Sequence, residues 1–195
     1  FQAAATALQA RGGGTLVIPP GTYLCNGLGT QHYNGSTVET LAAVFAFSSL
    51  DAVNIRCEGS LLKTTQTFSL GTIGWCWFRF NACSNVRLHG LNIQGVECWP
   101  TTYRQGTVGV LLVNRCANVE VDAKFRGTAY GVWSGQYGRP EIGQCTNVVT
   151  KVDAYDVGYP FALYNANNGR DMIESRRSHR AFAAYGIKNR DVLVH

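Results

Sequence analysis

The strongest constraint in this sequence is a repeated motif, an Asn or Asp followed by alternating apolar residues. Its copies recur every 20–33 residues, as NIRCEG from Asn54, NVRLHG from Asn85, NVEVDA from Asn118, NVVTKV from Asn147, the weaker DMIES from Asp171, and DVLVH from Asp191. Internal periods of this size are typical of repeat architectures, in which each unit buries its apolar face only by stacking on its neighbours. The unit holds short strands and no helix of useful length, so we expect one coil of a parallel β-solenoid.

The cysteines support the repeat rather than a metal site or a disulfide framework. Cys83, Cys116 and Cys145 each stand two residues before an Asn of the motif. Strands of a stack lie ~4.8 Å apart, so equivalent residues form ladders, and we expect these three cysteines to face inward as one ladder. An in-line stack cannot surround a metal tetrahedrally, and the seven cysteines contain no C-x-x-C pair, so no metal and no cofactor is predicted.

Composition limits the remaining classes of protein. The 195 residues suit one domain, residues 1–195, with a capping helix and glycine run over 1–14 and coils over 15–195. Only 15% of residues are charged and the net charge is +5, without a nucleic-acid recognition motif, so no nucleic-acid partner is expected. No apolar run approaches the ~20 residues of a membrane helix. The chain stops inside an apolar alternation, so we expect it to be part of a longer polypeptide.

The N-terminal segment carries a more specific signal. FQAAATALQARGGG predicts an alanine-rich helix ended by glycines, and TLVIPPGTYL predicts a strand, a turn and a second strand. This opening resembles that of the pectate-lyase-like superfamily, as found in bacteriophage tailspikes and glycoside-hydrolase-28-related proteins, and HRAFAAYGIKNRDVLV is similar in style to tailspike coils. The substrate-diagnostic Asn-Thr-Asp motif of polygalacturonases is absent, which argues against a plant-pectin enzyme.

The resemblance implies a right-handed parallel β-helix and a homotrimer located in a virion tail. The function that we expect is binding and depolymerisation of a bacterial surface polysaccharide, either capsule or O-antigen, by hydrolysis or by a lyase reaction. Two alternatives stay open: a secreted bacterial polysaccharide lyase or hydrolase, and a non-catalytic receptor-binding or structural solenoid. The superfamily contains all of these, so the fold does not choose among them.

Aligning the motif copies predicts an outward-facing stripe of ionisable residues. It contains Glu58, His89, Asp122 and Lys151 on successive strands. Glycoside cleavage uses two carboxyl groups, ~5–5.5 Å apart for retention and ~6.5–9.5 Å apart for inversion. Glu58 and Asp122, two strands apart, suit the second geometry. A lyase would instead use His89 as a base beside Arg87 or Lys151. The simpler interpretation is that these charges only pair with one another on a solvated sheet.

Further candidate residues lie downstream. The segment RDMIESRRSHRAF contains Asp171 and offers Glu174 and His179 as acid or base and Arg177 as a substrate ligand, and Asp156 could join a carboxyl pair across strands. Exposed aromatic rings beside carboxylates would suit a glycan groove, although buried aromatics are the usual alternative. The candidate binding residues are Trp75, Trp77, Glu97, Trp99, Tyr103, Trp133 and Tyr137.

Overall fold

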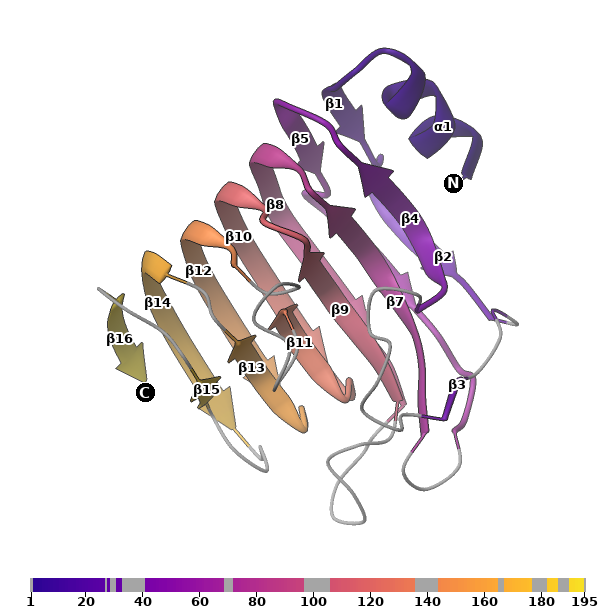
Figure 1. The fold of residues 1–195 in the computed structure, drawn as a ribbon. Helices are drawn as coiled ribbons and strands as arrows, with labels where there is room; N and C mark the ends of the chain where they lie inside the picture. The colour runs from indigo at the N-terminus through magenta and orange to yellow at the C-terminus, as the bar shows by residue number, and fades with distance from the viewer. Residues whose placement is uncertain are drawn as a thin grey trace.

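The chain passes back and forth between two β-sheets, and each pass stacks on the one before it. The computed structural model describes residues 2–26, 28, 31–32, 41–68, 72–96, 106–135, 144–164, 167–176, 182–185 and 190–194. Figure 1 shows the passes in chain order from the helix at one end to the last strand at the other. The stack is elongated, and its two ends carry the two ends of the described chain.

The two sheets are mainly parallel. Sheet A consists of β1 (Gly14–Val17), β2 (Gly21–Leu24), β5 (Val53–Arg56), β6 (Ser60–Lys63), β8 (Ser84–Gln94), β10 (Ala117–Arg126), β12 (Thr146–Tyr155), β14 (Asn167–Arg176) and β16 (Arg190–Val194). Sheet B consists of β3 (Gln31–His32), β4 (Ala43–Ser48), β7 (Thr72–Asn81), β9 (Gly106–Val113), β11 (Tyr130–Ser134), β13 (Tyr159–Tyr164) and β15 (Phe182–Tyr185). Among these strands only the β3–β7 pair is antiparallel.

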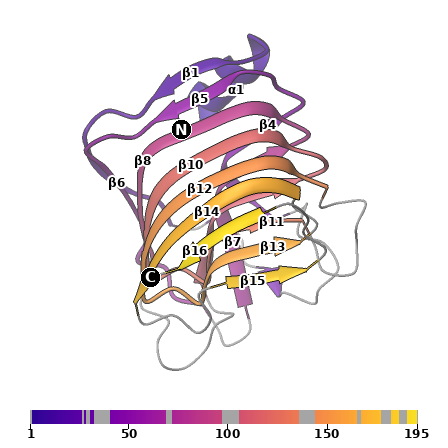
Figure 2. The ribbon, with the colours of Figure 1, turned by 90° about the vertical axis from the view of Figure 1, so that its left-hand side faces the viewer.

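The predicted class, all-β and parallel with one N-terminal helix, is confirmed. The described strands form two sheets, and the long strands of sheet A arch around the interior, as Figure 2 shows. A closed right-handed β-helix goes beyond two stacked parallel sheets and stays a prediction. Within the described part of the chain, the one helix is too short to cross a membrane.

Helix α1 (Gln2–Ala10) packs against the first strands through Ala5 and Leu8, which are both buried. The side-chain amide of Gln9 completes the contact. It donates to the carbonyl of Ser48 (2.7 Å) and accepts from the amide of the same residue (2.9 Å), as a neighbouring strand would. Gly13 ends the turn after the helix at φ 139°, where a Cβ would lie 2.1 Å from the carbonyl oxygen of Asp51, so the chain requires glycine there.

The predicted register is confirmed for the three central copies of the motif and wrong for the copies that begin at Asn54, Asp171 and Asp191. Val119 pairs with Val86 on one side and with Val148 on the other, and Cys83, Cys116 and Cys145 are fully buried, as expected. In contrast, Ile55 pairs with Leu88, and Val192 pairs with Asp171. Both terminal copies are therefore shifted by two residues.

The shift has a local cause at the first turn. The positions equivalent to Ser84 and Asn85 are occupied by Asp51 and Ala52, not by Val53 and Asn54 as the motif alignment predicts. Asn85, Asn118 and Asn147 have φ between 51° and 53°, and Ala52 has φ 56°. Each of the three asparagine amides donates to the side-chain oxygen of the preceding rung, and the series starts at the carboxylate of Asp51. We call Asp51, Asn85, Asn118 and Asn147 the asparagine ladder.

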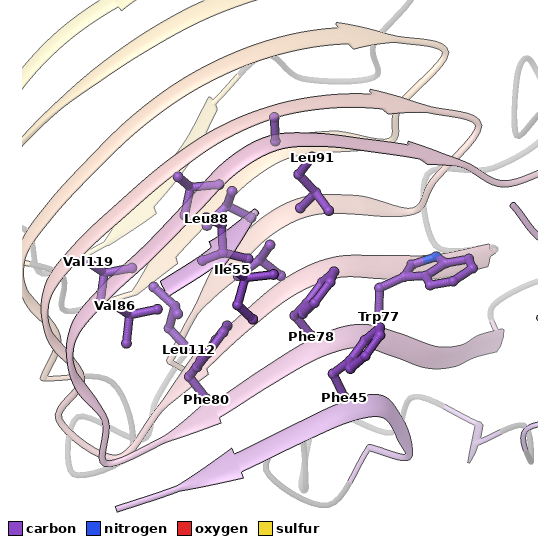
Figure 3. Close-up of a cluster of buried hydrophobic side chains, with 14 of the residues drawn as sticks. Phe45, Ile55, Trp77, Phe78, Phe80, Val86, Leu88, Leu91, Leu112 and Val119 are labelled. Carbon is purple, nitrogen blue, oxygen red and sulfur yellow. The ribbon is translucent and has the colours of Figure 1, made fainter. Parts of the chain in front are cut away.

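The main core lies between the two sheets. Neighbouring strands place residues of the same type next to each other. The rings of Phe45 and Phe78 lie 4.7 Å apart and nearly parallel, and those of Phe47 and Phe80 lie 5.3 Å apart. Figure 3 shows the rings of Phe45, Phe78 and Phe80 on the sheet B side of the core, with aliphatic side chains such as Ile55 and Leu88 on the sheet A side. Burial of such side chains contributes about 1.5–3 kcal/mol each, so stacked coils stabilise one another.

Candidate functional site

The outer face of sheet A carries most of the polar groups that were predicted to act on a substrate. On β10 the side chains alternate strictly: Val119, Val121, Ala123 and Phe125 are buried, whereas Glu120, Asp122, Lys124 and Arg126 are exposed. The same alternation continues in register on β12. Because parallel strands keep equivalent residues side by side, the exposed residues form stripes that run across the strands.

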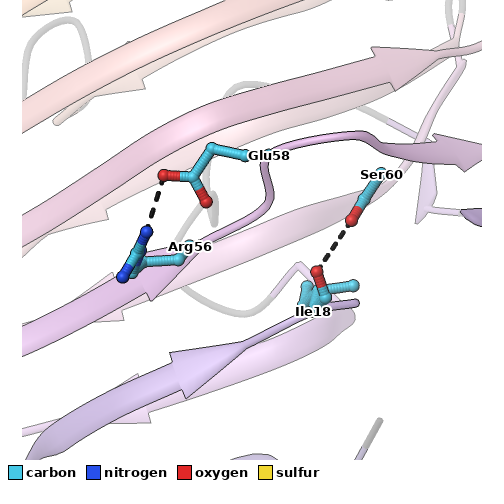
Figure 4. A network of polar contacts seen from close by, with 4 residues as sticks. All are labelled: Ile18, Arg56, Glu58 and Ser60. Carbon is cyan, nitrogen blue, oxygen red and sulfur yellow. Dashed lines mark hydrogen bonds and ion pairs between the residues drawn. The ribbon is translucent and has the colours of Figure 1, made fainter. Parts of the chain in front are cut away.

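Glu58 lies in the turn between β5 and β6. One contact holds its side chain, and another anchors the turn. Its carboxylate pairs with Arg56 at 3.5 Å, as Figure 4 shows. The turn itself is anchored by the hydroxyl of Ser60, which donates to the carbonyl oxygen of Ile18 at 2.8 Å. A hydrogen bond from the backbone of Glu58 and the charge of Arg56 lower the pKa of this carboxyl, so Glu58 stays ionised in neutral solution.

Gly90 on β8 makes room for Glu58. Gly90 has φ 66°, and a Cβ there would lie 2.9 Å from Cγ and 3.1 Å from the backbone nitrogen of Glu58. The β8–β10 register also shifts at this point, between Val121 and Ala123. A shift of this kind inserts an extra residue and redirects the strand, and such irregularities are frequent beside active sites.

A hollow of about 330 Å³ lies over Gly90. Its lining includes Gly59, Gly90, Asn92, Asp122 and Lys124. Glu58 stands at the adjoining turn, against β8, and Asp122 stands on β10, on the opposite side of β8. Two strand spacings, ~9.5 Å, separate their backbones. A carboxyl pair that acts with inversion is ~6.5–9.5 Å apart, so the two side chains would have to extend toward each other over β8.

A second hollow, of about 360 Å³, adjoins the first across β10. The two share Asp122, Ala123 and Lys124, and the second adds Lys151, Asp153, Met172 and Glu174. Lys124 pairs in register with Asp153, which pairs with Glu174. The carboxylate of Glu174 also contacts the guanidinium of Arg176. The two hollows together form a groove across β6, β8, β10, β12 and β14, lined by both acidic and basic residues.

The predicted stripe is assembled only in part, because Asp122 pairs in register with Lys151 whereas His89 pairs neither with Glu58 nor with Asp122. His89 is half-buried and pairs in register with Arg56 rather than with Glu58, although its charge still acts on the carboxyl of Glu58. Asp122 pairs with Lys151 as expected. Glu174 lies in the same groove, at the far end of the second hollow.

Asp156 does not face the groove, contrary to prediction. Its side chain is 1% exposed, and the residue occupies the turn after β12 at φ 56°, with its backbone N–H donating to the carbonyl of Arg176 (3.0 Å). The left-handed turn reverses the alternation of the strand, which carries the carboxyl inward. The remaining predicted residues lie outside the described part of the chain: Glu97, Trp99, Tyr103, Tyr137, Arg177 and His179.

The prediction that Trp75, Trp77 and Trp133 are exposed is wrong. Each is at most 1% exposed. The indole N–H of Trp75 donates to the side-chain oxygen of Gln66 at 3.2 Å, and the ring of Trp133 packs 4.3 Å from that of Tyr130. All three belong to sheet B, where β7 and β11 are buried on both faces over most of their length, so strand alternation did not distinguish an exposed side.

Two residues that line the groove, Lys124 and Asp153, and the nearby Tyr155 were not among the predicted site residues. Lys124 and Asp153 face each other across β10 and β12, and Tyr155 lies one step further along β12, with the Arg126 guanidinium carbon 5.8 Å from its ring centroid. The sequences VDAKFR and KVDAY could have predicted them. Apolar residues alternate with other residues in both segments, so extending the two strands beyond the motif places Lys124, Asp153 and Tyr155 on the outer face. A half-buried aromatic ring beside charged groups is the kind of surface on which a sugar can stack.

The thiols and carboxylates of the described residues do not suggest a metal centre. No group of three or more His, Cys, Asp or Glu side chains in the described ranges has the spacing to hold an ion. The three ladder cysteines are free thiols. The largest effect that raises the pKa of Cys116 is a hydrogen bond with Cys145, and the next largest is burial. Burial also raises the pKa of Cys83, so both thiols stay protonated.

Comparison with known proteins finds similarity in structure but not in sequence. No family model matches the sequence, and no curated protein matches it. Among solved structures, the fold is similar to the crystal structure of a "putative glycosyl hydrolase" from Parabacteroides merdae, with a TM-score of 0.59 and 12% sequence identity over 99% of this chain and 86% of that chain. At this identity the likeness extends to the fold alone: the chain shares its stacked parallel architecture with that protein.

Proposed function

We propose that this chain is a right-handed parallel β-helix that binds a bacterial surface polysaccharide in the groove of sheet A and cleaves it there. The single observation that carries the proposal is the placement of Glu58 against Gly90, next to the hollow whose lining includes Gly90 and Asp122. The similarity in fold to the Parabacteroides merdae protein agrees with carbohydrate processing. The tailspike-like identity, the homotrimer and the virion-tail location expected from the N-terminal segment belong to the same proposal.

The two carboxyl groups would divide the work of an inverting hydrolase. Glu58 is the base, since its lowered pKa keeps it ionised, and it takes a proton from the attacking water. The acid would be Asp122, whose protonated form would give a proton to the glycosidic oxygen as the bond to the anomeric carbon breaks and the water oxygen bonds to that carbon. Lys124 and Tyr155 would hold the adjacent sugars, through hydrogen bonds and stacking.

A lyase reaction is the second candidate, supported by His89 beside Arg56. In that reaction His89 would remove the proton next to a uronate carboxylate while a cation stabilises the resulting charge. The two reactions differ in their products, because only the lyase leaves an unsaturated sugar that absorbs ultraviolet light.

The test is product analysis on a panel of purified bacterial capsular and O-antigen polysaccharides. We expect new reducing ends without new ultraviolet absorbance. Glu58→Gln and Asp122→Asn should each lower the rate by at least about 100-fold, the contribution typical of a general acid or base. Asp191→Asn is the matched control, because Asp191 is an exposed acid of sheet A that does not line either hollow.

Three results would count against this assignment. New absorbance together with a loss of activity in His89→Gln would establish the lyase. Cleavage that survives both carboxyl substitutions would move the active site elsewhere. Binding of a polymer by the wild type with no product of either kind would leave a receptor-binding solenoid.

A further inference from the structure

A further hollow lies outside the groove, beside the asparagine ladder. It has a volume of about 740 Å³ and spans β5, β8, β10 and β12 at the ends of these strands that are nearest the ladder. Its lining contains three ladder asparagines together with Asn54, Arg87, Glu120 and Val149. Neither Glu58 nor Asp122 contributes to it.

One polar atom in this hollow has no partner. The side-chain oxygen of Asn54 is shielded from solvent and accepts no hydrogen bond from any residue that the structure describes. A buried acceptor without a donor costs about 1–3 kcal/mol. A hydrogen-bond donor brought to Asn54 by a ligand in the hollow would remove this cost.

The other polar groups of the hollow also keep unused capacity. Arg87 and Glu120 form a long ion pair of 3.7 Å, with 68% and 50% of their side chains exposed, so most of their donors and acceptors face solvent. The amides of Asn85 and Asn118 each spend one N–H on the ladder, whereas a side-chain amide carries two. The second N–H of each is therefore available to a ligand.

These features select the chemistry of the ligand. The charges of Arg87 and Glu120 cancel, so the hollow does not favour an anionic polymer. An added peptide strand is excluded because β8, β10 and β12 already have hydrogen-bonded neighbours on both sides. Val149 is 43% exposed and gives a small apolar surface beside the amides. Mixed donors and acceptors with a limited apolar surface suit a neutral compound that is rich in hydroxyl groups.

We infer that this hollow is a second carbohydrate-binding site, which takes a neutral segment of a linear polysaccharide lying across the strands. The ladder repeats at the strand spacing of ~4.8 Å, close to the length of one hexopyranose unit, so successive sugars meet successive amides. The site holds the polymer without cleaving it, and it does not require Glu58 or Asp122 to be catalytic.

Affinity electrophoresis of the folded chain tests the inference, in gels that contain dextran, pullulan, xylan, galactomannan or mixed-linkage β-glucan. We expect at least one polymer to retard the wild type. The double variant Arg87→Gln with Glu120→Gln, which keeps the net charge, should weaken that retardation by about tenfold or more. The double variant Arg170→Gln with Asp191→Asn is the matched control, because it removes an ion pair of similar length (3.9 Å) from the same stripe outside the hollow.

Asn54→Ala provides an independent variant, since its side-chain oxygen makes no hydrogen bond within the described chain and its removal should not unfold the protein. It too should weaken retardation, with an unchanged thermal unfolding temperature. The inference is overturned if no polymer retards the wild type, or if both hollow variants migrate like the control. Cleavage assays on the same variants judge the groove separately, because a chain can lose retardation and still cut a short oligosaccharide.

Discussion

The side-chain amide of Asn118 donates a 3.0 Å hydrogen bond to the side-chain oxygen of Asn85, the residue at the same position one strand earlier. Both residues are in the left-handed region of φ, which only glycine and asparagine adopt at low cost. The ladder therefore joins two requirements at one position, a backbone conformation and a hydrogen bond between coils.

Substitution of Asn118 separates these requirements. Asn118→Ala loses the bonds to Asn85 and Asn147 and keeps the strained φ of 53°, so the free energy of unfolding should fall by about 2–3 kcal/mol. Asn118→Gly loses the bonds without the strain and should cost about 1 kcal/mol less. Urea unfolding of both variants measures the difference, and equal stabilities would show that the conformation plays no part.

The Gly90 hollow leads to a prediction about the active site. Gly90→Ala places a Cβ 2.9 Å from Cγ of Glu58, so it should displace this turn and lower the cleavage rate by about tenfold or more. Gly12→Ala is the control, because Gly12 also has a positive φ (78°) but nothing lies within 4 Å of the added carbon. Equal cleavage rates for the two variants would show that catalysis does not depend on the position of Glu58 beside Gly90.

Cys57 should make the fold sensitive to alkali. Burial raises the pKa of its thiol from 9.0 to about 12. Above pH 9 the unfolded chain loses this proton while the folded chain keeps it, so stability is complete below pH 9 and falls as the pH rises toward 12. Urea unfolding at several pH values should show a shallower decline for Cys57→Ala than for the wild type. Identical slopes would rule out this thiol as the cause.

The corrected position of Trp77 can also be tested. Trp77→Ala should lower the free energy of unfolding by about 3–5 kcal/mol, the range for a large aromatic residue in a core. The smaller change Trp77→Phe should preserve the fold and leave polysaccharide binding per folded molecule unchanged. A selective loss of binding in that variant, with normal stability, would restore the role that was predicted from the sequence.

The repeat allowed the centre of the stack to be predicted, and the ends show why the method fails there. Matching Asn to Asn is correct for Asn85, Asn118 and Asn147, where the same residue supplies both the left-handed turn and the ladder bond. At the first coil those two tasks are divided between Ala52 and Asp51. An alignment that looks for Asn then selects Asn54, and every position of that strand shifts by two.

The candidate groove was predictable in sheet A and misjudged in sheet B for a related reason. Along β10, alternate residues are apolar, so VEVDAKFR separates the exposed Asp122 and Lys124 from the buried Val121 and Ala123. The sequence GWCWFRF has aromatic and apolar residues on both faces of its strand, because nearly all of β7 is buried. Alternation carries information only where one face of a sheet meets water.

The direction of the asparagine ladder has a consequence for how such a chain can change in length. Every amide donates toward the N-terminal end, and the series begins at Asp51, whose ionised carboxylate accepts but cannot donate. A coil that carries Asn both donates and accepts, so duplicating it inside the stack would leave every bond matched. A coil that carries Asp at this position fits only at the start. Growth by duplication is therefore compatible with the interior of the stack, while its first coil is fixed.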